Sequence, residues 1–89
     1  MIDVKEAVLI AKQKASEVLS QPTTVLEEIE RDDYKGHEIW NITLSYPRDP
    51  SQVSGLARLT ADPLQYKRFL VDGETGDLHA IRVREFASR

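Results

Sequence analysis

An acidic run is the densest group of chemically capable side chains in this chain. It comprises Glu27, Glu28, Glu30, Asp32 and Asp33. Carboxylates at this density can bind a hard cation, but an EF-hand loop needs oxygen ligands at fixed steps around a glycine, and the run lacks that pattern. We therefore interpret it as a solvated or edge-protecting strand, whose charge would also steer a basic partner.

Two histidines, His37 and His79, lie far apart in the sequence. Neither has a second ligand at a metal-motif spacing. A histidine beside an aspartate can act as an acid–base pair, but no recognisable motif places a serine, threonine or lysine as a nucleophile. The sequence therefore predicts no catalytic residue, no metal site and no cofactor, with His37 in a turn and His79 half-buried in a strand.

Three arginines, Arg68, Arg82 and Arg84, gather near the C-terminal end. Guanidinium groups form paired hydrogen bonds to carboxylate and phosphate oxygens, so these side chains can clamp an anion if they share a face. The alternative is a solvent-facing sheet surface on which they pair with Glu28 or Glu30 across strands.

Two tyrosines, Tyr46 and Tyr66, flank a long connection from 47 to 63 and are candidate interface anchors, because aromatic residues often serve that role. A connection of this length in a small domain is often functional. The predicted partner-binding residues are Tyr46, Tyr66, Arg68, Arg82 and Arg84.

The bulk composition places these residues in one domain that spans residues 1–89. The absence of cysteine excludes disulfides and thiolate sites, and together with acidic residues near the start it favours the cytoplasm over an exported location. A net charge of −3 argues against non-specific nucleic-acid binding. No stretch reaches the roughly 20 apolar residues of a membrane helix.

An amphipathic helix is predicted from Asp3 to Leu19. Asp3 and Glu6 have the spacing of a capping box, and Ser20 precedes the sequence Gln-Pro, which ends a helix. Its apolar residues recur at three- and four-residue steps. The expected stripe comprises Val4, Ala7, Val8, Ala11, Ala15, Val18 and Leu19.

Four strands are predicted after the helix. Residues 24–32 alternate weakly, which indicates an edge strand or a bulge. Residues 37–46 alternate strictly, with Trp40 and its companions on one face. Residues 66–71 and 78–85 flank a polar turn and predict a hairpin, in which pairing of Phe69 with Ile81 would place the arginines on the outer face. In that register Val71 and Val83 join the core.

The predicted order of one helix and four strands gives an α+β fold, with the helix packed across one face of a four-stranded antiparallel meander. Consecutive antiparallel strands usually lie side by side, so the meander is the simplest topology. The register of the last hairpin stays open, since a slip of one residue would turn every side chain to the other face.

This layout resembles the PepSY-like family. The features that carry the resemblance are the helix ending near Leu19, the strand GHEIWNITLSY from 36 to 46 and the closing unit YKRFLVDGETGDLHAIRVRE. In that family an apolar strand is typically followed by Asp, polar residues ending in Thr-Gly and a second apolar strand, as in Val71 to Gly76 here. The family is associated with peptidase propeptides and with secreted or membrane-anchored bacterial proteins. The resemblance implies the same fold, an inhibitory or ligand-binding role and no catalytic motif.

The combined prediction is a non-catalytic binding module that recognises a protein or peptide partner and acts as an inhibitor. One alternative is an immunity- or antitoxin-like protein whose acidic strand masks a basic toxin. Another is a small-ligand carrier or enzyme that uses the 47–63 connection as a lid. Homodimerisation through edge strands is compatible with each of these alternatives.

Overall fold

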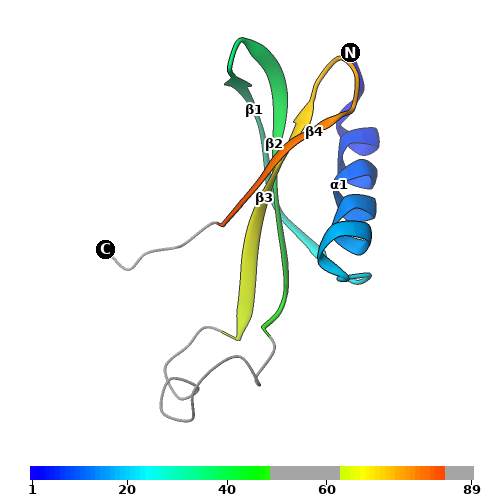
Figure 1. Ribbon diagram of the computed structural model, residues 1–89, viewed down its shortest axis with the longest axis vertical. Helices are drawn as coiled ribbons and strands as arrows, with labels where there is room; N and C mark the ends of the chain where they lie inside the picture. The colour runs from blue at the N-terminus through cyan, green and yellow to red at the C-terminus, as the bar shows by residue number, and fades with distance from the viewer. Residues whose placement is uncertain (49–62, 84–89) are drawn as a thin grey trace, which may run out of the picture.

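The computed structural model describes residues 1–48 and 63–83. One helix, α1 (Val4–Leu19), is followed by four strands, β1 (Val25–Tyr34), β2 (His37–Pro47), β3 (Leu64–Asp72) and β4 (Leu78–Val83). The strands form an antiparallel sheet in the order β1-β2-β3-β4, and α1 lies against one face of it (Figure 1). The predicted α+β meander is confirmed. No helix in the described part of the chain is long and apolar enough to cross a bilayer.

The ends of α1 form as the sequence indicates. The carboxylate of Asp3 accepts a hydrogen bond from the backbone N–H of Glu6 at 2.8 Å, which satisfies one of the unpaired N–H groups of the first turn. At the other end Ser20 takes a left-handed conformation, with φ of 57°, and its N–H bonds the carbonyl of Ala15. The left-handed residue stops the helix and satisfies a terminal carbonyl.

Small residues form the contact between α1 and the sheet. Ala7, Ala11 and Ala15 are fully buried, so the helix backbone can approach the sheet closely. Their partners are buried side chains of the two central strands. These partners are Ile42, Leu44, Phe69 and Val71. The stripe is narrower than predicted, because Val4 and Val18, near the two helix ends, remain exposed while Ile10 packs against the core.

The register of the sheet separates two faces. Trp40, Ile42 and Leu44 face α1, and the alternate residues Asn41, Thr43 and Ser45 face the other way. Phe69 pairs with Ile81 as predicted, but Val83 is exposed rather than part of the core. We call the side away from α1 the second face. No described helix or strand packs on it (Figure 1).

Several strand boundaries differ from the sequence expectation. β1 continues to Tyr34, because a tight turn with positive φ at Lys35 and Gly36 joins it directly to β2. β1 is an edge strand with an irregularity between Leu26 and Glu28, as its weak alternation indicated. β3 begins at Leu64, two residues earlier than predicted. Most of the 47–63 connection, the proposed lid, lies outside the described residues, as do residues 84 and 85 of the last strand.

Candidate functional site

Two of the predicted binding residues meet on the second face. Arg68 on β3 pairs directly with Arg82 on β4, and the face also carries Tyr66, which pairs with Ser45. Tyr46 lies on the opposite face and is 6% exposed, and burial raises the pKa of its hydroxyl. Its ring is therefore packed inside the protein instead of being presented to a partner. Arg84 lies outside the described residues.

The pairing of Arg68 with Arg82 has an electrostatic cost. Like charges directly opposite each other on one face of a sheet repel. In addition, Nε of Arg68 is buried and finds no hydrogen-bond partner in the described part of the chain, and the same holds for Oδ1 of Asn41 on this face. A buried donor or acceptor that lacks a partner costs about 1–3 kcal/mol. Arg68 and Asn41 thus bring a costly buried donor and a costly buried acceptor to the second face.

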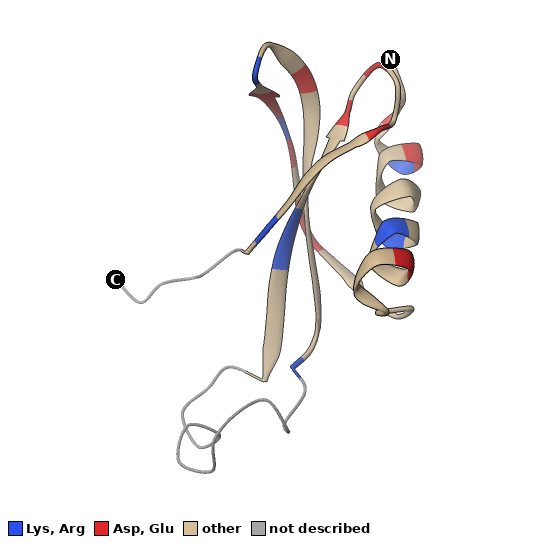
Figure 2. Ribbon diagram, viewed as in Figure 1, with Lys and Arg blue, Asp and Glu red and all other residues tan. Residues whose placement is uncertain are grey.

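The acidic run occupies β1 and partly reaches over this face. Oγ of Ser45 donates to Glu27 at 2.7 Å, and Nδ2 of Asn41 lies 3.4 Å from Asp32. Strand β2 separates these acids from Arg68, so the face changes from acidic at β1 to basic at β3 and β4 (Figure 2). Two of the acids, Glu27 and Asp32, thus serve as hydrogen-bond acceptors for polar β2 residues, a role that the sequence alone did not indicate.

A second group on this face was not predicted. The structure brings both histidines to Asp72. Nε2 of His79 lies 2.8 Å from Oδ2 of Asp72, and Nδ1 of His37 lies 3.7 Å from the same oxygen. The two imidazole rings are 5.0 Å apart between centroids. Asp72 is almost completely buried, His79 is half-buried and His37 is exposed.

The backbone explains how three distant residues meet. His37 follows the tight β1–β2 turn, and Asp72 ends β3 where it pairs with Ile39. The β3–β4 pairing shifts register, since Leu70 lies opposite Ala80 but the next residue, Val71, lies opposite Leu78. His79 therefore has no opposite residue on β3, as in a β-bulge. Regular alternation would have placed His79 on the α1 side with Ile81, as the sequence indicated.

The β3–β4 turn fixes the Asp72 carboxylate. Its Oδ1 accepts hydrogen bonds from the N–H groups of Glu74 at 2.7 Å and Thr75 at 3.0 Å. The hydrogen bond from His79 is the main cause that holds the pKa of Asp72 well below its usual range, and the two backbone N–H groups add to it. Gly76 takes the positive φ that the turn requires, whereas Gly73 gives the close approach to the Glu38 carbonyl.

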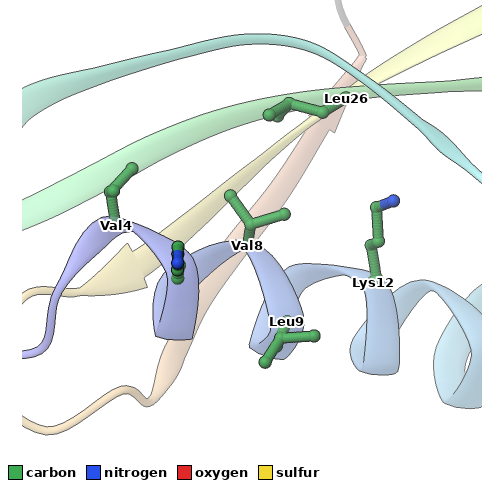
Figure 3. Close-up of a pocket in the computed structure, with 6 residues that line it drawn as sticks. Val4, Val8, Leu9, Lys12 and Leu26 are labelled. Carbon is green, nitrogen blue, oxygen red and sulfur yellow. The ribbon is translucent and has the colours of Figure 1, made fainter.

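An apolar groove lies on the other side of the molecule, between α1 and β1. It has a volume of about 420 Å³ and is lined by Val4, Lys5, Val8, Leu9, Lys12 and Leu26. In Figure 3, Val4, Val8 and Lys12 extend from the helix towards the region of Leu26. Leu9 is 68% exposed and Leu26 is 40% exposed. The sequence signal for this groove was the position of Leu9 outside the main helix stripe.

The chain was compared with known proteins in three ways. No family model matches it, and no match was found among curated proteins or solved structures. The resemblance to the PepSY-like family therefore stays a prediction.

Proposed function

We propose that this chain is a non-catalytic binding module whose second face recognises an acidic segment of a protein or peptide partner. The observation that supports it is the direct pairing of Arg68 with the like-charged Arg82, where Nε of Arg68 is buried and has no hydrogen-bond partner within residues 1–48 and 63–83. A carboxylate between the two guanidinium groups would offset their repulsion and accept hydrogen bonds from their N–H groups.

The surroundings of the arginine pair suit a polar segment. Tyr66 is the neighbour of Arg68 on β3 that faces the same way. The Arg82 guanidinium lies 5.2 Å from the centroid of the Tyr34 ring. This cation–π contact restrains Arg82, so less side-chain freedom is lost when a partner binds. The acids of β1, at the opposite edge of the sheet from β4, repel an acidic segment. This repulsion directs the partner towards the arginines of β3 and β4.

The first experiment compares two charge-matched double variants. R68Q/R82Q removes two positive charges from the second face, and K5Q/K12Q removes two from the groove beside α1. Binding of a fluorescein-labelled glutamate-rich peptide is followed by anisotropy, with a lysine-rich peptide as the second probe. The wild type and K5Q/K12Q should bind the acidic peptide similarly, and R68Q/R82Q should bind it about tenfold or more weakly.

A native partner is then sought by affinity capture with the same three proteins. A partner that wild type and K5Q/K12Q retain and R68Q/R82Q loses would support the proposal. Capture that depends on Lys5 and Lys12 instead would place the binding site in the groove. Equal binding of the acidic peptide by all three proteins would contradict a role for the arginine pair.

A second candidate function uses β1. This strand is an edge of the sheet, and Glu28, Glu30 and Asp33 on it are exposed. An exposed acidic edge can mask a basic protein, as an immunity- or antitoxin-like protein would do. In that case the variant E28Q/E30Q should lose the captured partner, while R68Q/R82Q should keep it.

A further inference from the structure

The cluster of His37, Asp72 and His79 has the composition of a transition-metal site. It offers two imidazole nitrogens and one carboxylate oxygen, and these ligand atoms all lie within 4.8 Å of one another. Imidazole nitrogen suits zinc and its first-row neighbours, whereas calcium and magnesium prefer shells made of oxygen. Three protein ligands with a fourth position left open is a common arrangement for zinc.

Two of the three distances between the ligand atoms are near those that such an ion requires, and the third, between the two imidazole nitrogens, is within 4.8 Å. Ligands about 2.0–2.1 Å from a tetrahedral ion stand roughly 3.4 Å from one another. The 3.7 Å separation of His37 Nδ1 from Asp72 Oδ2 is close to that value. The 2.8 Å separation of His79 from the same oxygen is a hydrogen bond and must lengthen by about half an ångström. The exposed position of His37 leaves room for its ring to adjust.

The groups around the cluster orient its ligands. Asp72 uses Oδ1 for the two backbone N–H groups of the turn, and this leaves Oδ2 directed at both imidazoles. Hydrogen bonds of this kind to a ligating carboxylate are the usual outer-shell support of a metal site. The Tyr34 ring lies 5.7 Å from the His79 ring and packs beside it.

The irregularity of β4 is a further indication. Without the extra residue in the β3–β4 pairing, His79 would lie on the α1 side and could not reach Asp72. Bulges are frequent beside functional sites because they redirect a side chain. Here the bulge and the tight β1–β2 turn both place imidazoles at the carboxylate that ends β3.

We propose that His37, Asp72 and His79 bind one divalent transition-metal ion of the zinc type, through Nδ1, Oδ2 and Nε2 respectively. The fourth position of the ion faces solvent. The metal site does not depend on the proposed recognition of an acidic partner by Arg68 and Arg82. Either property can therefore fail without the other.

The test uses the full chain without an affinity tag, after chelator treatment and dialysis. Zn²⁺ binding is measured by titration calorimetry, and Co²⁺ serves as a spectroscopic probe, because its visible absorption reports the number and geometry of its ligands. The wild type should bind one ion per chain, and Zn²⁺ should raise its melting temperature. The variants are H37Q and H79Q. Glutamine keeps a polar side chain at each position but removes the imidazole ligand.

Each histidine variant should lose about tenfold or more in Zn²⁺ affinity and should lose the Co²⁺ absorption of the wild type. D77N removes a carboxylate of the same turn that is outside the cluster, so this control should bind as the wild type does. Circular dichroism of the metal-free variants checks that they fold. Absence of saturable binding by the folded wild type would overturn the proposal, as would unchanged binding by folded H37Q or H79Q.

Discussion

Replacement of Phe69 by alanine tests the assignment of the core. Phe69 is fully buried at the centre of β3, where it pairs with Ile42 and Ile81 beneath the alanines of α1. Removing a buried phenylalanine side chain costs about 3–5 kcal/mol, from lost burial and from the cavity that remains. A chain of 89 residues has a total stability of roughly 4–13 kcal/mol. Phe69→Ala should therefore remove a large share of the stability, or unfold the protein.

Urea unfolding followed by the fluorescence of Trp40, the single tryptophan, gives the measurement. The midpoint should fall strongly with little change in slope, and the melting temperature should drop by roughly 10–40 °C. Leu9→Ala is the matched control on α1, because Leu9 is 68% exposed, and its effect should stay within about 0.5 kcal/mol. A loss below about 1 kcal/mol for Phe69→Ala would refute the packing of α1 on this part of the sheet.

Two further perturbations test the helix contact and the β3–β4 turn. Ala11→Leu inserts a large side chain where the helix touches the sheet and should cost about 1–3 kcal/mol in urea unfolding, while Ser16→Leu on the exposed side should cost little. The hydrogen bond from His79 lowers the pKa of Asp72 in the folded protein. The ionised carboxylate therefore contributes its full stabilisation above the unfolded pKa of about 3.9, and this stabilisation is lost as the pH falls from there through the lower folded pKa. In metal-free protein, the melting-temperature difference between wild type and Asp72→Asn should therefore narrow in acid. A difference that stays constant from pH 6 to pH 2 would contradict this linkage.

Local patterns determined the secondary structure well. The Asp3 cap, the alternation around Trp40 and the turn after Asp72 each depend on residues within a few positions of one another. Side-chain periodicity and capping are local properties, so the sequence was sufficient for the helix, the four strands and the meander. The pairing of Phe69 with Ile81 was one register that the turn allowed, and the structure selects it, because the sequence left a slip of one residue open.

The environment of individual aromatic residues was harder to predict. Tyr46 and Tyr66 both flank the same connection, yet they lie on opposite faces because their positions in β2 and β3 differ in parity. Trp40 is only half-buried, since it lies beside the α1 contact. Its Nε1 donates a hydrogen bond to the Ile2 carbonyl at 3.2 Å, and the Arg31 guanidinium lies 5.4 Å from the centroid of its ring. Burial depends on which neighbours cover a face, and strand periodicity does not contain that information.

The sequence by itself determined the elements and their order, whereas the pairing of the strands in the structure placed Arg68 and Arg82 on one face. Only the tertiary structure decided that His37 and His79 converge on Asp72, and that Nε of Arg68 is buried with no hydrogen-bond partner among the described residues. The physical reason is that one extra residue in β4 reverses the side-chain direction of His79, and this irregularity arises from pairing between strands. Local periodicity cannot specify a bulge, because a bulge is a property of the pairing between two strands and not of the residue pattern of one.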